Sequence, residues 1–174
     1  KLNSFLPNDI VIYKIFNVND KAHTRFDAQS RSYEYRIYIG RNPFLLETTW
    51  QFYHQKLDVE KMNEAAYLLL SYKDFKCFAK AKTDVKTYNC DITNAEWIVE
   101  DTLLVFYITA DRFLRNMVRA IVGTLVDSGL HKSTVENFRT IIESKDRTKA
   151  GFSVPAKGLF LTHIEYPKSV LTNE

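Results

Sequence analysis

The sequence predicts an α+β fold, with a mixed and mostly antiparallel sheet whose helices pack on one face. Residues 33–39 alternate between faces as a half-buried strand does. Two further strand-like runs, 92–99 and 103–110, are joined by Glu100-Asp101, which indicates a hairpin. Residues 111–129 instead carry apolar side chains at helical spacing. These elements are interleaved without a regular strand-helix-strand rhythm, and that favours an α+β arrangement.

The first half of the chain is expected to supply two strands and one helix. Residues 9–19, rich in Ile, Val, Tyr and Phe, predict a strand. In the next strand, one face carries Tyr33, Tyr35, Ile37 and Ile39, and the other Ser32, Glu34 and Arg36. Residues 45–55 are aromatic and read as an irregular segment, with Trp50, Phe52 and Tyr53 packed under a loop.

A helix is predicted to begin at Asp58. Leu57 and Met62 stand at the two positions of a hydrophobic staple around this start. Its buried stripe is expected to comprise Met62, Ala65, Ala66, Leu69 and Leu70. We read this helix as part of the scaffold.

The second half is expected to end in a helix, a loop and a strand. Residues 103–110 are apolar on both faces and predict a central strand. The capping box from Ser133 to Glu136 predicts a helix that runs to about Lys145. A loop over 146–157 and a strand over 158–166 follow. We expect one domain over residues 1–167 and a loose tail over 168–174.

The predicted helix over 111–129 carries three arginines. Asp111 is placed to cap its first turn, and Gly129 to adopt the left-handed conformation after its last. Arg112, Arg115 and Arg119 fall within an arc of roughly 60° beside the apolar face. They are either solvated arginines with packed stems or fixed, directional charges at the rim of the core.

Composition excludes several classes of protein. The 174 residues are 45% hydrophobic, which suits a globular domain with a substantial core, and no apolar run is long enough for a membrane span. The net charge of +3 is compatible with a nucleic-acid partner without arguing for one. Two isolated cysteines fit a reducing cytoplasm, and four scattered histidines make a zinc site unexpected. The first residues show no signal-peptide layout and read as a cut or processed start.

Several motifs stand in one order along nearly the whole chain. They are Asn3-Ser-Phe-Leu-Pro-Asn-Asp-Ile10, Phe26-Asp-Ala-x-Ser-Arg-x-Tyr-x-Tyr35, Asp58-Val-x-x-Met-Asn-x-Ala-Ala66, Asp74-Phe75, Phe113-Leu-Arg-Asn-Met-Val-Arg-x-Ile-Val-Gly-Thr124, Asp146-Arg-Thr-x-Ala-Gly151, Pro155-Ala-x-Gly-Leu-x-Leu161 and Tyr166-Pro167. Together they resemble the C-terminal two-thirds of a TruA-type tRNA pseudouridine synthase.

This resemblance implies a cytoplasmic homodimer, not associated with a membrane, that isomerises uridines in the anticodon stem-loop of tRNA. It implies no metal and no organic cofactor. The target uridine is turned out of the RNA, as in other base-modifying enzymes. The bond between the uracil and the ribose is then broken, the uracil rotates, and it rejoins through carbon. An aspartate does the nucleophilic or electrostatic work.

The resemblance also assigns roles to individual residues. Tyr33 would stack on the target uracil and is a candidate proton acceptor, although an ordinary tyrosine hydroxyl is a poor base. Arg119 would be the ion partner of the catalytic aspartate, a role that bidentate geometry gives to arginine over lysine. Leu159 would line the pocket. Arg31 and Arg115 are candidate phosphate contacts.

One departure from the family pattern matters most. The family's aspartate lies in an Arg-Thr-Asp-Ala-Gly-Val-His stretch that does not occur in this sequence. Lys82-Thr-Asp84 echoes it only superficially, so we reject Asp84 as the nucleophile. Residues 87–92 also lack an arginine that many relatives carry. We therefore expect an enzyme portion that is inactive alone, its aspartate lying outside this chain. The alternative is a non-catalytic RNA-binding or dimerisation module with the same fold.

Overall fold

The computed structural model describes residues 1–53, 55–81 and 85–171. They form two compact units, one made of Lys1–Ala28 with the C-terminal residues from Tyr166, the other of Gln29–Glu165. The sheet and the α-helices of the described residues belong to the larger unit. Within the described ranges, no helix has the length and apolar character that crossing a membrane requires.

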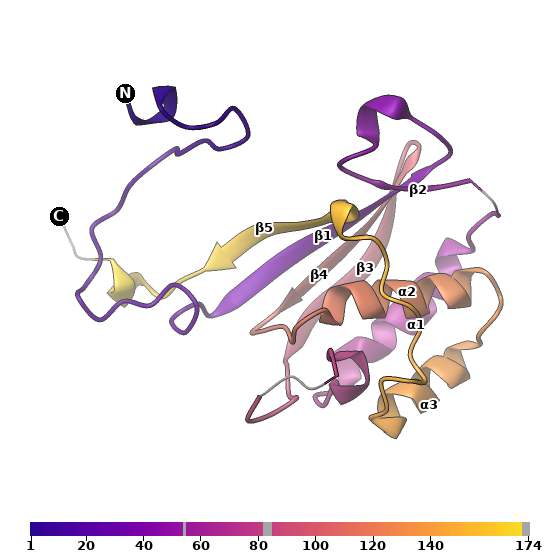
Figure 1. The fold of residues 1–174 in the computed structure, drawn as a ribbon. Helices are drawn as coiled ribbons and strands as arrows, with labels where there is room; N and C mark the ends of the chain where they lie inside the picture. Colours follow the sequence, from indigo (N-terminus) through magenta and orange to yellow (C-terminus); the bar gives the residue numbers. More distant parts are fainter. Residues whose placement is uncertain (54, 82–84, 172–174) are drawn as a thin grey trace. The chain divides into compact units, whose positions relative to one another are not determined.

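A five-stranded sheet forms the framework of the larger unit (Figure 1). Strands β2, β1, β4 and β3 lie side by side in that order, and β5 also pairs with β1. β1 and β2 run parallel, whereas the β1–β4, β1–β5 and β3–β4 pairs are antiparallel. The strands span Ser30–Ile39 (β1), Trp50–Phe52 (β2), Ile92–Glu100 (β3), Leu103–Ala110 (β4) and Leu159–Glu165 (β5). The predicted fold class is confirmed, with its hairpin and its central strand β4.

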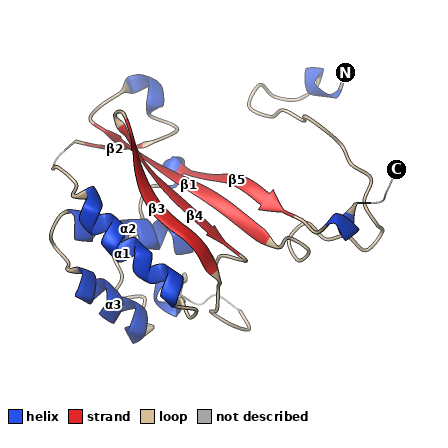
Figure 2. Cartoon of the chain, turned by 180° about the vertical axis from the view of Figure 1, so that it is seen from behind, coloured by secondary structure: helices blue, strands red, loops and turns tan. Residues whose placement is uncertain are grey.

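Three helices lie on one side of this sheet: α1 (Val59–Leu68), α2 (Met117–Gly129) and α3 (Val135–Ser144) (Figures 1 and 2). The core lies between them and the strand face that carries Tyr35 and Ile37 of β1, both fully buried. α2 is apolar nearly all round because it packs against both α1 and α3. Because β1 and α2 contribute side chains to the same core, their relative position is fixed. These two elements carry the residues predicted for the site.

The start of α1 confirms the prediction. The Asp58 carboxylate accepts a 3.1 Å hydrogen bond from the backbone N–H of Lys61 as the N-cap. Leu57 and Met62 are both buried, as expected of a hydrophobic staple. Further along, the Asn63 amide exchanges hydrogen bonds of 2.7 and 3.0 Å with the backbone of Trp97 in β3. The Asn63 side chain therefore satisfies the backbone N–H and C=O of Trp97 on the outer edge of β3.

The strand predicted over residues 9–19 is wrong. Within the described residues this segment forms a single isolated bridge, between Val18 and Leu171, and is otherwise irregular. Its large apolar side chains are exposed, Tyr13 at 94% and Ile15 at 74%. Composition of this kind favours a strand only where another strand supplies the hydrogen-bonding edge.

Residues 45–53, within the segment predicted to be irregular, are more regular than expected. Trp50–Phe52 form β2, which pairs in parallel with the last residues of β1. Phe52 is buried, and Trp50 stacks edge-on against it, with ring centroids 5.2 Å apart. Three residues are too short a run to show alternation, so the sequence pattern did not reveal this strand.

The predicted start of the arginine helix is also wrong, because α2 begins at Met117. The Asp111 carboxylate accepts hydrogen bonds from the backbone N–H groups of Asp91, at 2.6 Å, and Arg112, at 2.7 Å. It therefore holds the end of β4 beside residue 91. Asn116 adopts a left-handed conformation with φ 68°, which separates residues 111–116 from the helix.

Two details of the neighbouring helix ends also differ from the prediction. Gly129 is the last residue of α2, and the left-handed residue is His131, with φ 56°. Gly129 is small for a packing reason, since a Cβ there would lie 2.6 Å from the sulfur of Met62. The cap of α3 is Thr134, whose hydroxyl accepts a hydrogen bond from Asn137 N–H, and Ser133 lies just before it.

Candidate functional site

β1 aligns Arg31, Tyr33 and Tyr35 on one face of the sheet, and residues 111–119 run alongside that face. The Arg31 guanidinium donates a 2.7 Å hydrogen bond to the carbonyl of Asp111. The Tyr33 ring packs edge-on against Phe113, with centroids 5.1 Å apart and planes at 87°. These two interactions join the first half of β1 to residues 111–113. Tyr35 and Arg119 follow them, each on its own segment.

The Tyr35 side chain is fully buried, and its hydroxyl lies close enough to Arg119 to feel its positive charge. It donates a 2.8 Å hydrogen bond to the carbonyl of Pro155. Burial raises the pKa of the Tyr35 hydroxyl well above its usual value, and the positive charge of Arg119 opposes this shift. The hydroxyl therefore remains a hydrogen-bond donor at neutral pH and anchors the segment that precedes β5.

Arg119 is half-buried on the first turns of α2 and is tied to the same segment. Its Nε donates a 2.6 Å hydrogen bond to the carbonyl of Val154, and Val154 N–H donates to the carbonyl of Arg119 at 3.2 Å. Among the described residues, no carboxylate lies within the 4.0 Å of an ion pair with this guanidinium. Since Nε is already bonded, the pair of terminal nitrogens is the edge that suits a carboxylate.

Arg147, to which the sequence alone assigns no role, fixes the loop that carries Val154. It donates to the carbonyls of Ala150, at 3.3 Å, and Gly151, at 3.1 Å, and to the hydroxyl of Ser153, at 3.1 Å. Asn116, just before α2, donates to the same Ser153 hydroxyl at 2.6 Å. The loop is thereby held from its own beginning and from the start of α2. In the sequence, the motif around Arg147 stands out only as part of the family resemblance.

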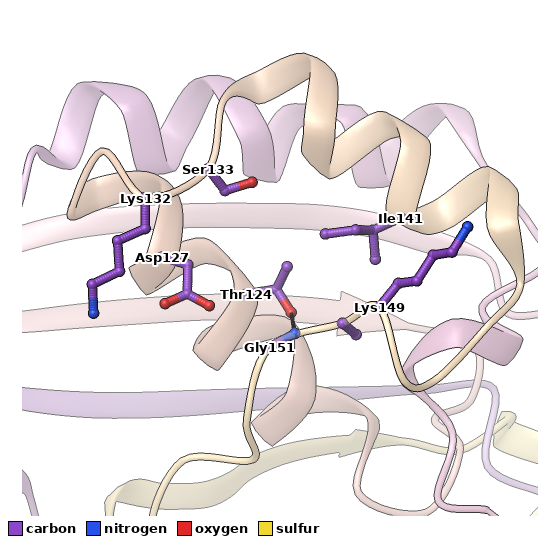
Figure 3. Close-up of a pocket in the computed structure, with 8 residues that line it drawn as sticks. Thr124, Asp127, Lys132, Ser133, Ile141, Lys149 and Gly151 are labelled. Carbon is purple, nitrogen blue, oxygen red and sulfur yellow. Dashed lines mark hydrogen bonds between the residues drawn. The ribbon is translucent and has the colours of Figure 1, made fainter.

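The middle of α2 holds the same loop through close backbone packing. The Thr124 hydroxyl accepts a 2.9 Å hydrogen bond from Gly151 N–H (Figure 3). At the preceding residue, a Cβ on Gly123 would overlap the carbonyl oxygen of Phe152. Figure 3 shows the pocket beside this interaction, with Asp127 and Lys132 on one side and Lys149 on the other. Glycine at position 123 therefore allows the loop to lie directly on the helix.

The other residues predicted for the site have fewer contacts that tie them to Arg119 and Tyr33. Leu159 is the first residue of β5, opposite Tyr35, and packs against the core while remaining partly exposed. Arg115 is exposed and its carbonyl accepts a hydrogen bond from Lys80 N–H. Neither Arg112 nor Arg115 is helical, so the proposed arc of three arginines is wrong, and Arg119 alone keeps its expected place on the helix. Asp84 lies outside the described residues.

Comparison with known proteins identifies one family. The family model described as "tRNA pseudouridine synthase" matches residues 65–167. A protein named tRNA pseudouridine synthase A from Bacteroides thetaiotaomicron is 51% identical, over 100% of this chain and 65% of its own length. Proteins of the same name are 51% identical in Parabacteroides distasonis, over 100% of this chain and 69% of theirs, and 41% identical in Clostridium acetobutylicum, over 95% and 68%. The chain thus spans about two thirds of the length of these relatives.

Proposed function

Since this chain belongs to the tRNA pseudouridine synthase family, we propose that it forms the larger part of an enzyme that converts uridine to pseudouridine in tRNA. The targets we propose are uridines of the anticodon stem-loop. The chemistry is an isomerisation: the C5 proton of the base is released, N1 gains a proton, and the bond from N1 to the ribose is replaced by one from C5.

The observation that carries this proposal is the environment of Arg119. Val154 holds its Nε, and its terminal nitrogens have no carboxylate partner among the described residues. A half-buried arginine in this state suits an incoming aspartate, which it would keep ionised and oriented for attack or charge stabilisation at the ribose. We propose that this aspartate belongs to a part of the enzyme outside the present chain.

The other predicted residues take supporting roles in this proposal. Tyr33 would stack on the flipped uracil, with its ring held by Phe113. Leu159, at the start of β5, would border the base on the side of Tyr35. Arg31 and Arg115 would contact phosphate groups next to the target nucleotide. We further propose that the whole protein acts in the cytoplasm and that it forms a homodimer. Sedimentation of the complete protein tests the oligomeric state directly.

A tritium-release assay tests the activity. The substrate is tRNA labelled with tritium at C5 of its uridines, incubated either with the complete protein or with this chain alone. We expect turnover by the complete protein and none by the isolated chain. Turnover by the isolated chain would show that the catalytic carboxylate lies within it. A complete protein that binds tRNA without releasing tritium would instead be the non-catalytic RNA-binding module.

A further inference from the structure

Two neighbouring backbone carbonyls, those of Val154 and Pro155, are bonded to different elements of the larger unit. The Tyr35 hydroxyl in β1 donates a 2.8 Å hydrogen bond to the carbonyl of Pro155. Arg119 in α2 donates a 2.6 Å hydrogen bond from Nε to the carbonyl of Val154. Figure 1 shows the segment between α3 and β5, to which both carbonyls belong. A short stretch of backbone therefore connects the strand and the helix that carry the residues predicted for the site.

The Tyr35 ring also packs closely against the end of this segment. The ring is fully buried. A Cβ on Gly158 would lie 3.0 Å from Cζ of Tyr35 and 2.8 Å from the carbonyl oxygen of Arg36. Glycine at position 158 therefore lets the 3-10 turn Ala156–Gly158 lie directly on the ring and on the backbone of β1. Tyr35 thus holds the segment at two points, at Pro155 by its hydroxyl and at Gly158 by its ring.

The Tyr35 hydroxyl is suited to donate a hydrogen bond and not to accept a proton from the substrate. Burial raises its pKa well above the usual value of a tyrosine, although the positive charge of Arg119 opposes this shift. Its one proton is donated to the Pro155 carbonyl. A neutral phenol is a poor base at neutral pH. An effect of this hydroxyl on the reaction must therefore come from the backbone that it holds.

The Val154 and Pro155 carbonyls have little freedom to move independently. The peptide bond between the two residues is planar. The ring of Pro155 restricts its φ, which is −53° in the structure. A change in the position of the Pro155 carbonyl is therefore transmitted to the Val154 carbonyl, the group that holds the guanidinium of Arg119.

We propose that Tyr35 is a positioning residue of the isomerisation, which fixes the orientation of the Arg119 guanidinium through the Val154–Pro155 backbone. This inference rests on the proposed function. Tyr33, proposed to stack on the uracil, lies two residues before Tyr35 on the same face of β1. Tyr35 therefore relates the residue proposed to hold the base to the residue proposed to hold the catalytic carboxylate.

The first test is Tyr35→Phe in the complete protein, which keeps the ring and removes only the hydroxyl. We expect kcat for tritium release from tRNA to fall about tenfold, as for the loss of one buried hydrogen bond, while KM changes less than twofold. The matched control is Tyr107→Phe, because the Tyr107 hydroxyl donates a 2.7 Å hydrogen bond to the exposed side chain of Glu100. Its kcat should remain within twofold of the wild type.

A double-mutant cycle tests whether the hydroxyl acts through Arg119. Tyr35→Phe is introduced into the wild type and into Arg119→Lys, and single-turnover rates are measured for all four proteins. In the Arg119→Lys background we expect Tyr35→Phe to lower the rate less than twofold, because the guanidinium that it positions is absent. The same factor in both backgrounds would show that Tyr35 acts independently of Arg119, and it would overturn the proposal.

A second variant keeps the hydrogen-bond donor and removes the phenol. With 4-aminophenylalanine at position 35, an aromatic N–H group can donate to the Pro155 carbonyl. We expect its kcat to lie within threefold of the wild type. Urea unfolding shows that each variant is folded under the assay conditions. A folded 4-aminophenylalanine variant with a tenfold loss of kcat would contradict a positioning role, whether or not Tyr35→Phe folds.

The outcomes separate this inference from the proposed function. If the complete wild-type protein releases no tritium from tRNA, the proposed function itself has failed. If the wild type is active and Tyr35→Phe keeps the kcat of the control, only the positioning role of Tyr35 has failed. A loss confined to KM would also overturn this role, because it would place the effect of the hydroxyl in RNA binding.

Discussion

The Nε of Arg119 and the carbonyl of Val154 form a 2.6 Å hydrogen bond between residues 35 positions apart in the chain. The bond fixes the plane of the guanidinium, and it leaves the two terminal nitrogens as the donor pair for the acidic partner that we propose. A lysine at this position would offer one nitrogen for both tasks.

This geometry predicts a large effect of Arg119→Lys in the complete enzyme. We expect kcat to fall about 100-fold, which corresponds to about 2.7 kcal/mol less transition-state stabilisation. The physical reason is that lysine can neither form the Val154 bond together with a two-point interaction nor hold the partner carboxylate in one orientation. Single-turnover tritium release at saturating tRNA measures the change.

Arg112→Lys is the matched control, since Arg112 lies outside the helix and its backbone is held by Asp111. We expect its rate to remain within threefold of the wild type. Equal, small losses in the two variants would show that Arg119 does not orient the reacting carboxylate.

The structural surroundings of the candidate site were predictable only in part, for a physical reason. The sequence pattern drew attention to Arg119 through three arginines on one predicted helix, yet Arg112 and Arg115 are not helical. The groups that hold Arg119 and Tyr35 are the backbone carbonyls of Val154 and Pro155. Every residue has such a carbonyl, so no residue type marks it. Only the fold shows which carbonyl faces which donor.

Arg147→Lys tests whether the loop acts through Arg119. This change keeps the positive charge but removes the forked hydrogen bonds to Ala150, Gly151 and Ser153. We expect kcat to fall about tenfold while KM for tRNA changes less than twofold, because the altered loop position moves the Val154 carbonyl away from Arg119. Loss of these hydrogen bonds should also lower the free energy of unfolding by about 1–2 kcal/mol. Steady-state kinetics well below the unfolding temperature separate the two effects.

The control for this variant is Arg139→Lys, which alters an exposed ion pair with Glu136. Its kinetics and stability should match those of the wild type. A loss of stability in Arg147→Lys without any loss of kcat would show that the loop contributes to folding alone.

Gly123→Ala should destabilise the protein, against the usual trend for a helix interior. Alanine normally stabilises a helix by about 1 kcal/mol relative to glycine. Here its Cβ would overlap the carbonyl oxygen of Phe152, so the loop must move away from α2. We expect a net loss of about 2 kcal/mol in the free energy of unfolding, as for other overpacked sites. Urea unfolding followed by tryptophan fluorescence measures it.

Gly129→Ala provides the comparison within the same helix. Its Cβ would meet the side chain of Met62, which is flexible and can move, rather than a backbone carbonyl. The loss should therefore be clearly smaller than for Gly123→Ala. If Gly123→Ala were as stable as the wild type, the loop would not depend on direct packing against the helix.

The fold was predictable where short-range patterns decide it. Alternation identified β1, the turn between β3 and β4 identified the hairpin, and Asp58 marked the start of α1. Prediction failed where a distant group decides the backbone conformation. Asp111 reads as a helix cap, but its carboxylate binds the N–H of Asp91, twenty residues earlier. The apolar segment over 9–19 has strand composition and, among the described residues, no extended partner strand.

Asp127→Asn should stabilise the protein at neutral pH and have no effect in acid. Burial raises the pKa of the Asp127 carboxyl, although the charge of Lys132 opposes the shift. The folded state therefore binds this proton more tightly than the unfolded state, and stability falls as pH rises from the unfolded pKa through the folded one. Asparagine removes this loss, with a gain of about 0.5 kcal/mol above the folded pKa.

Asp146→Asn should show the opposite pH dependence, since hydrogen bonds from Thr148 lower the pKa of Asp146. Urea unfolding between acid and neutral pH distinguishes the two, and a gain for Asp127→Asn that persists below the unfolded pKa would rule out ionisation as its cause.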